Sequence, residues 1–369
     1  MRAKLHVNGV EDGSLVATLK NNAGLRLFVK PIKWTGLHLD FLDIQFVNLL
    51  PITQPIPRVD PSKATKDIPA PAQALISALD NLLETKSEEY RIRSILTIIS
   101  KLYPQQMSFL DISELHQYFG GRAYRITCLV QAAWKVTPPR TSSTTPRESM
   151  STRTKGSVEV PTVDNIGGRI TRNQPILVYV DLKAIAVKRR AGYKATRDNS
   201  PVRRLKKLLY RKITPSNIKE DPFLAAIILA LAQRPFYQDS SSPADETFTS
   251  SSELLSLGGS MFYDITVHIL AVNDKKPSAP YFIIYKGLVR KELLQKFHEP
   301  TRNYGEETLA GTLEGRTNMQ IEYTEVPIWP ILGLKERLGK ALGREVAGHF
   351  DENNIEMWEQ DLSRTAAVS

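Results

Sequence analysis

Positive charge is gathered into one segment of this 369-residue chain, between residues 183 and 219. The segment holds thirteen Lys or Arg and a single acidic residue, whereas the rest of the chain, with 36 basic and 38 acidic residues, is nearly neutral. Like charges repel one another, so such a segment cannot fill a core and is expected to stay extended or solvated. The pattern predicts a nearly neutral globule that carries one basic insertion, which is the source of the net charge of +10.

Two clusters within this segment have the spacing of a bipartite nuclear-import signal. They are separated by twelve residues: Lys188, Arg189 and Arg190, then Arg203, Arg204, Lys206 and Lys207. Such a signal needs two basic clusters bridged by a flexible spacer, and Gly192 and Pro201 disfavour a helix between them. Ser200 precedes Pro201 and is a candidate for phosphorylation, which would add a charge of about −1.5 to −2 there. The segment therefore predicts an import-receptor or anion-binding site.

Two other interpretations of the basic segment stay open. It could be a solvated insertion without a partner, or it could contact nucleic-acid phosphates directly, since neutralising phosphates requires little beyond Lys and Arg. Tyr193 and Tyr210 are the stacking surfaces that the segment offers, and no nucleic-acid-binding module surrounds it.

The composition limits the class of protein. Apolar residues make up 41% and charged residues 24%, a balance typical of a globular chain with a sizeable core. The single cysteine, Cys128, excludes a disulfide framework and a cysteine-based metal site. The start of the sequence lacks the apolar stretch of a secretory signal, and the longest apolar run, 223–232, has ten residues where a membrane span needs about 20. We expect a soluble protein of the nucleus, the cytoplasm or both, with no membrane contact.

Hydrophobic periodicity predicts an α+β fold. Helical spacing indicates helices at 75–83, 92–102, 112–119, 222–233, 290–297 and 334–346. Apolar or alternating stretches indicate strands at 4–10, 14–19, 25–30, 37–50, 125–136, 176–182, 262–272 and 281–289. We expect a single mixed α/β body with small antiparallel sheets, packed helices and long flexible insertions.

Low-complexity stretches suggest the division of the chain. Eleven of the 21 residues in 137–157 and eight of the fourteen in 239–252 are Ser or Thr, which cannot fill a core, and we expect these stretches to be disordered. We expect residues 1–136 to form an N-terminal α+β region, 137–172 a linker, 173–350 a C-terminal α+β region and 351–369 a tail. The C-terminal region contains the basic insertion 183–219 and the Ser-rich loop 239–252.

Four hydrophobic blocks in the C-terminal region look familiar: EDPFLAAIILALAQ at 220–233, DITVHILAV at 264–272 with YFIIYKGLVRKELLQKF at 281–297, and VPIWPILGLKERLGKALG at 326–343. They resemble a family of filamentous-fungal proteins with no assigned activity. The resemblance implies a fungal, intracellular origin. It involves no catalytic signature, so it assigns no functional residue.

One pattern suggests an alternative function, a divalent-metal nucleic-acid hydrolase. Asp264, Asp274 and Lys276 superficially match the PD-(D/E)xK nuclease pattern, in which two carboxylates hold Mg²⁺ and a lysine polarises the attacking water. Asp274 and Lys276, however, lie in a Pro-containing turn where the pattern needs a strand. Lys286 is well placed on the next strand, but Ile284 stands where its acidic partner should be. The pattern is degenerate.

No other catalytic set is complete. The six histidines are scattered without an HExxH motif, and neither a nucleophile elbow nor a dinucleotide-binding fingerprint occurs. We therefore expect no resident metal or cofactor, with Mg²⁺ entering only in the hydrolase alternative. The leading hypothesis is a non-enzymatic interaction protein whose basic segment binds an import receptor or another acidic protein; the rivals are the hydrolase and a non-specific nucleic-acid-binding protein. The oligomeric state is not predicted.

Overall fold

The computed structural model builds one mixed β-sheet from seven of the strands it describes. The described residues are 9–55, 70–85, 87–112, 114–126, 129–136, 177–194, 200–237, 262–274, 279–304 and 317–348. The strand order is β1 (Ile44–Asn48), β9 (Met319–Pro327), β8 (Tyr281–Val289), β7 (Ile265–Asn273), β6 (Leu177–Val180), β5 (Val130–Val136) and β2 (Met107–Leu110). β1–β9 and β6–β7 are parallel pairs, and the other neighbours are antiparallel. The predicted α+β class is confirmed, with a sheet larger than the small antiparallel sheets we expected.

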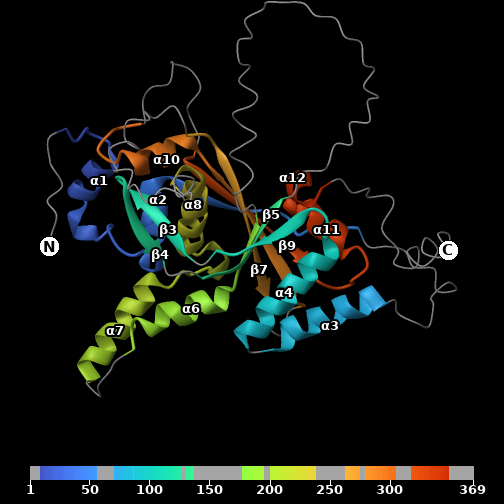
Figure 1. The fold of residues 1–369 in the computed structure, drawn as a ribbon. Coiled ribbons are helices and arrows are strands. Elements are labelled where there is room, and N and C mark those ends of the chain that lie inside the picture. The colour runs from blue at the N-terminus through green and yellow to red at the C-terminus, as the bar shows by residue number, and fades with distance from the viewer. Residues whose placement is uncertain are drawn as a thin grey trace, which may run out of the picture.

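Side chains of successive residues along the central strands enter two separate cores. On β7, Ile269 and Ala271 pack into the core on one face, while Leu270 and Val272 pack into the core on the other. The first face is covered by α8 (Pro222–Tyr237), α2 (Gly36–Leu42), α10 (Lys291–His298) and the two-stranded sheet of β3 (Leu115–Phe119) and β4 (Arg122–Ile126). The second is covered by α3 (Ala70–Glu84), α4 (Glu88–Leu102), α11 (Leu334–Leu342) and α12 (Arg344–Ala347). Both faces of the sheet are therefore buried against other elements (Figure 1).

The apolar run predicted as a helix at 222–233 is the central helix α8. Its residues from Pro222 to Gln233 are all buried, because the helix is enclosed between the large sheet and the β3–β4 hairpin. Gly287 on β8 lets α8 approach closely: a Cβ at this position would lie 2.7 Å from Cγ2 of Ile228. The predictions at 75–83 and 92–102 are likewise confirmed, as α3 and α4.

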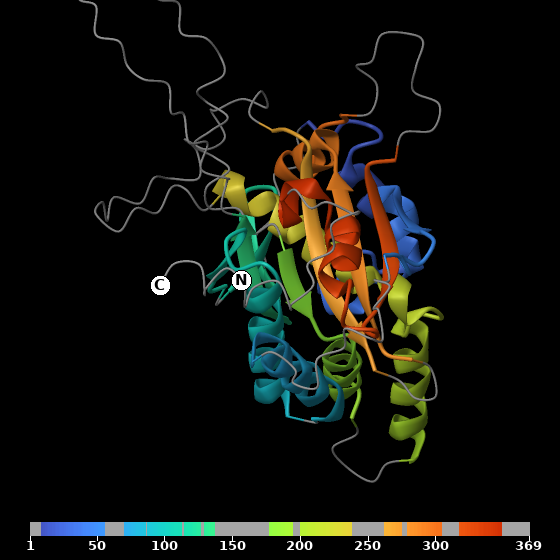
Figure 2. The same cartoon turned by 90° about the vertical axis from the view of Figure 1, so that its right-hand side faces the viewer.

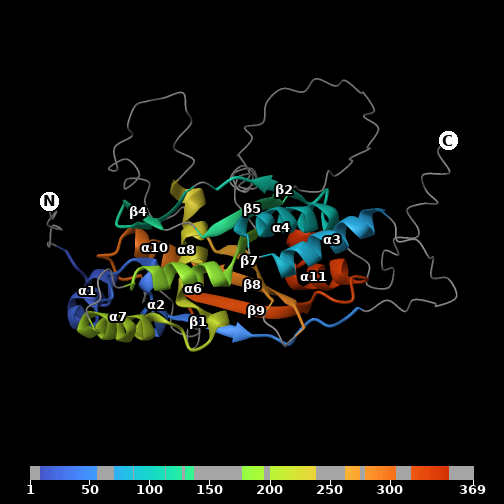
Figure 3. The ribbon, with the colours of Figure 1, turned by 90° about the horizontal axis from the view of Figure 1, so that it is seen from below.

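The helices that pack around the sheet lie in two groups, at opposite ends of the molecule (Figure 3). α1 (Leu15–Asn21), α2 and α10 lie at one end, and α3, α4 and α11 lie at the other. Short 3₁₀ turns, η1 (Ala23–Leu25) and η2 (Pro31–Lys33), connect α1 to α2.

Several strand predictions in the N-terminal region are wrong. Residues 15–19 belong to α1, and residue 14 is its N-cap: the Ser14 side chain accepts a hydrogen bond from the Ala17 amide at 3.2 Å. Residues 25–30 form no strand, and 37–50 divides into α2 and β1 at Asp43, a non-glycine residue with a φ of 51°. Short apolar stretches do not distinguish a two-turn helix from a strand by periodicity alone. The strand predicted at 4–10 lies mainly outside the described residues.

The short helix predicted at 112–119 is also wrong, because residues 115–119 form β3. Gly120 and Gly121 follow it with φ of 57° and 72°, and the chain returns as β4. Two consecutive positive φ angles are the requirement of a tight hairpin turn, which glycine meets without steric cost. The turn therefore decides the structure of this segment.

We expected the basic segment to be extended or solvated; it is largely helical, and most of its described cations are exposed. It forms α6 (Leu182–Ala191) and α7 (Ser200–Ile213), followed by η5 (Ile218–Glu220). Asp181 caps α6 by accepting a hydrogen bond from the Lys183 amide at 2.8 Å. Lys, Arg and Leu are strong helix formers, and most of their charges remain in solvent because α6 and α7 form a hairpin at the edge of the body (Figure 2). The stretches 137–157 and 239–252, which we expected to be disordered, lie outside the described residues, as do the rest of the predicted linker 137–172 and the tail 351–369.

None of the helices in the described ranges combines the length and the apolar character needed to cross a bilayer.

Candidate functional site

The two basic clusters lie on different helices and differ in exposure. Lys188, Arg189 and Arg190 lie in the last turn of α6, where Lys188 and Arg190 are exposed. Arg189 is only 4% exposed and makes a two-pronged ion pair with Asp221, with N–O distances of 2.7 and 2.6 Å. Its Nε also donates to the Ile32 carbonyl at 3.2 Å. Arg189 therefore holds α6 against the body and cannot contact an outside partner while the protein is folded.

The second cluster lies on α7, which has no buried residue. Its cations are Arg203, Arg204, Lys206, Lys207, Arg211 and Lys212. The Lys206 ammonium donates to the Lys194 carbonyl at 2.7 Å, and the rings of Tyr193 and Tyr210 lie 6.3 Å apart, so α7 is tied to the end of α6. In the described part of the chain, Arg204, Lys207 and Arg211 make no ion pair with an acidic side chain. These charges are open to solvent.

An apolar stripe runs along the same helix, which the sequence reasoning missed. Val202, Leu205 and Leu209 are 41%, 56% and 38% exposed, and Leu208 beside them is 57% exposed. The spacing of these residues was present in the sequence, but we had not expected a helix, and without a helix the residues share no face. α7 is thus an amphipathic basic helix whose apolar side is exposed in the described structure.

Ser200, the phosphorylation candidate, is the first residue of α7 and is exposed. The N-terminal end of a helix carries a partial positive charge and unpaired N–H groups. A phosphate on Ser200 would be compatible with this position, since it adds negative charge where the helix favours it.

The two carboxylates of the hydrolase alternative lie at opposite ends of β7. Asp264 precedes this strand and Asp274 follows it; at about 3.3 Å per residue, ten residues of strand separate them by roughly 30 Å. Asp264 accepts from Arg290 at 2.6 Å and from the Lys291 amide at 2.9 Å, at the start of α10. One Mg²⁺ cannot bridge carboxylates so far apart, and the structure does not assemble the predicted centre.

The remaining members of that pattern do not converge either. Lys286 lies opposite His268 across β7 and β8 and binds Glu345 at 3.1 Å. Arg290, the partner of Asp264, lies four residues beyond Lys286 along the chain, roughly 13 Å away at about 3.3 Å per residue. Lys276 lies outside the described residues, as does Cys128. Among the residues that the structure describes, no group of three His, Cys, Asp or Glu side chains is placed to hold a metal ion.

Asp274 instead belongs to a structural ion-pair cluster at the carboxyl ends of β6 and β7. Arg91 of α4 contacts Asp274 at 2.9 Å and Asp181 at 3.4 Å, and Lys183 contacts Asp274 at 2.6 Å. Burial raises the pKa of Asp274, but hydrogen bonds from Lys183 and Arg91, together with their charges, outweigh it and lower the pKa below its ordinary value. The cluster joins α4 and α6 to the sheet.

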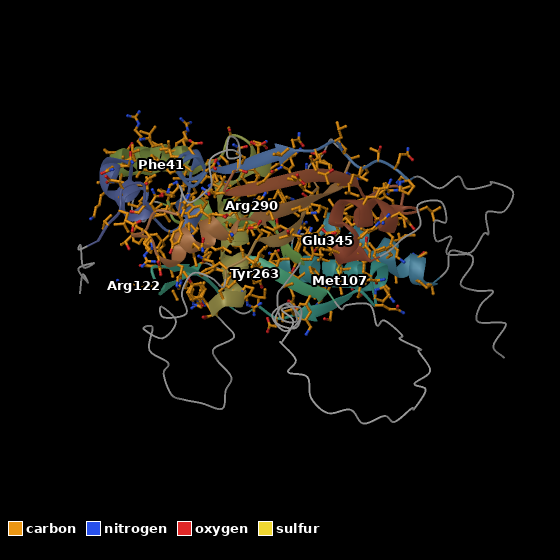
Figure 4. All side chains as sticks on the ribbon, turned by 90° about the horizontal axis from the view of Figure 1, so that it is seen from above. Phe41, Met107, Arg122, Tyr263, Arg290 and Glu345 are labelled. Carbon is orange, nitrogen blue, oxygen red and sulfur yellow. The ribbon has the colours of Figure 1, made fainter. Side chains whose placement is uncertain are left out.

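A second feature without a signal in the sequence is an apolar cavity of about 540 Å³ between α1, α2 and the β3–β4 hairpin. Its lining includes the largely buried rings of Trp34, Phe119 and Phe297 and the more exposed rings of Phe28 and Phe41. The residues come from three distant stretches of the chain, which is why no local pattern indicated the cavity. Figure 4 shows Phe41 at the end of the molecule where α1 and α2 lie.

Comparison with known proteins adds no assignment: models of protein families and the curated proteins were both searched, and neither search finds a match to the chain. The resemblance to filamentous-fungal proteins stays a prediction.

Proposed function

We propose that the chain is a non-enzymatic interaction protein that binds an acidic protein partner through α7. The observation that carries the proposal is the exposed apolar stripe bordered by cations. Val202, Leu205 and Leu209 have the i, i+3, i+7 spacing by which an amphipathic helix anchors in an apolar groove. A complementary partner has such a groove with acidic residues along its rim, so that burial and charge pairing act together.

The apolar stripe favours a protein over nucleic acid. Phosphate contacts would use the cations of α7 and leave the stripe exposed to water. Base stacking needs aromatic rings, and Tyr210 is the aromatic residue that α7 carries. A basic helix with leucines on its apolar side also fits a membrane surface, so the second test below includes lipid vesicles.

An import receptor is one acidic partner of this kind, so the proposal includes entry into the nucleus. The residues that would act are those with solvent access, Lys188 and Arg190 on α6 together with Arg203, Arg204, Lys206 and Lys207 on α7. Arg189 is not among the proposed binding residues, because it is buried and paired with Asp221.

The first test follows the location of a fluorescently tagged full-length chain in cells. Changing Arg203, Arg204, Lys206 and Lys207 to Ala is expected to abolish nuclear enrichment. The matched control changes four exposed cations outside the basic segment to Ala and loses the same charge: Lys20, Lys33, Lys101 and Arg122. Nuclear enrichment that survives in the α7 variant, or that is lost equally in the control, overturns the import step.

The second test measures binding of the full-length chain to a purified import receptor by fluorescence anisotropy. The α7 alanine variant and the variant Leu205→Gln with Leu209→Gln should each bind at least about tenfold more weakly. The second variant keeps every charge, so its loss would show that the stripe contributes. A DNA duplex and phosphatidylserine vesicles are the comparison probes. Tighter binding to either of them than to the receptor would contradict a protein partner.

A further inference from the structure

The cavity beside α1 and α2 has the properties of a small-molecule site. Its volume of about 540 Å³ lies within the roughly 300–1,000 Å³ of typical ligand pockets. This volume is far larger than a single water requires, so the cavity can hold a small organic molecule. Its wall is mostly aromatic and aliphatic, so an apolar ligand would gain from leaving water.

One buried polar side chain in the wall has no hydrogen-bond partner among the described residues. Gln117 on β3 is 7% exposed and lines the cavity. Gln117 is paired with Tyr124 of β4 through the backbone. No described residue makes a hydrogen bond with the side-chain amide of Gln117. The amide is therefore a hydrogen-bond donor in an otherwise mostly apolar wall. A ligand oxygen that accepts from it would gain a hydrogen bond.

The ionised groups that line the cavity are cationic. Lys30 and Arg125 belong to its lining, whereas no Asp or Glu does so among the described lining residues. Arg125 is already paired with Glu114 at 3.0 Å, which leaves the exposed Lys30 as the open charge. A cation and an amide donor in an otherwise apolar site are complementary to an anionic oxygen acceptor.

We propose that this cavity binds an apolar monocarboxylate of the fatty-acid class. The alkyl chain lies against Trp34, Phe119 and Phe297, and the carboxylate accepts from Gln117 and pairs with Lys30. The site is separate from α7, so this proposal does not depend on the interaction that we assign to that helix.

The test titrates dodecanoate into the full-length chain by isothermal titration calorimetry, with dodecanol as the uncharged comparison. The wild-type chain should bind one dodecanoate saturably and should bind dodecanol more weakly. Lys30→Met is expected to weaken dodecanoate binding about three- to fivefold, the range of an exposed ion pair. Gln117→Met should weaken it about three- to tenfold, the range of a net hydrogen bond.

The matched control is Lys20→Met, which removes an exposed cation on α1 that does not line the cavity; it should bind like the wild type. Unfolding midpoints in urea verify that each variant is folded. The proposal is overturned if the wild type shows no saturable binding, if dodecanol binds as tightly as dodecanoate, or if Lys20→Met weakens binding as much as Lys30→Met.

Discussion

Two adjacent arginines show how much one position changes the role of a side chain. Arg189 and Arg190 have the same chemistry and lie in the same cluster, yet Arg189 is buried against Asp221 while Arg190 is in solvent. The helix rotates successive residues by about 100°, so one of the two faces the body. A sequence pattern that counts cations treats the pair as equal.

The structure predicts very different effects of removing these two arginines on stability. Arg189→Ala leaves the carboxylate of Asp221, whose side chain is 2% exposed, without its partner. Loss of one member of a buried ion pair costs about 3–5 kcal/mol of unfolding free energy. Arg190→Ala removes an exposed charge and should change it by less than about 0.5 kcal/mol. Urea denaturation of both variants measures the difference, and equal stabilities would show that the Arg189 pair does not hold α6.

The identity of that partner could not be predicted from the sequence. Asp221 is 32 residues away from Arg189, and nothing local distinguishes it from other acidic residues. Asp264 and Asp274 show the opposite error: they are close in the sequence, which suggested that both bind one Mg²⁺. The extended strand β7 between them places the two carboxylates at its opposite ends. In both cases the residue types indicated what chemistry a side chain can take part in. Which side chains lie close enough to interact was decided by the fold.

At the scale of elements, the side chain of a histidine caps the N-terminal end of helix α2. The backbone N–H of Thr35 donates to Nδ1 of His38 at 3.0 Å, and Nε2 lies 3.1 Å from the Leu27 carbonyl. Nδ1 must therefore be unprotonated and Nε2 must carry the hydrogen, an assignment that follows from these partners. Burial lowers the pKa of His38 below 6.5, although the backbone hydrogen bonds with Leu27 and Thr35 act in the opposite direction.

This cap predicts a loss of stability in mild acid. Because the pKa of His38 is lower in the folded chain, the unfolded chain binds more protons once the pH falls below about 6.5, and the folded state is destabilised as the pH approaches its own pKa. His38→Gln keeps an acceptor at the third helical position, where Gln serves in capping boxes, and does not titrate. Urea unfolding at about pH 7.5 and about pH 5.5, on either side of the ordinary histidine pKa, should show a smaller decrease for this variant. An equal decrease in both proteins would assign the acid sensitivity elsewhere, for instance to His298, whose pKa burial also lowers.

The elements differ in how well the sequence predicted them, and length explains the difference. α3 and α4 have long stretches with a clear helical period, α8 and the strands β7 and β8 are long apolar runs, and all were predicted correctly. α1, α2 and β3 have five to seven residues each, where tertiary contacts and turn geometry decide between helix and strand. The cavity lies between these short elements, so the region that we assign to a ligand is the one that local patterns describe least.

At the scale of the whole molecule, the N-terminal and C-terminal regions share one sheet. Residues before 137 supply β1 at one edge and β5 with β2 at the other, and the strands between them come from residues after 176. β1 pairs with β9 and β5 pairs with β6. α3 and α4 of the N-terminal region share one apolar core with residues of the C-terminal region, including Leu270, Phe282 and Ile284. Neither region can bury its apolar surface without the other.

This arrangement predicts that the two regions fold only together. A chain divided after residue 156 breaks the connection between β5 and β6 and cuts no described element. Co-expressed, the pieces 1–156 and 157–369 should associate one to one and unfold in a single thermal transition, since the paired strands and both cores can re-form. Expressed alone, 157–369 would leave β9 and β6 as open edges beside uncovered apolar residues, and we expect it to aggregate. Light scattering and circular dichroism measure association and cooperativity. If the piece 157–369 alone is monomeric and unfolds at the midpoint of the intact chain, the sheet does not require its N-terminal strands.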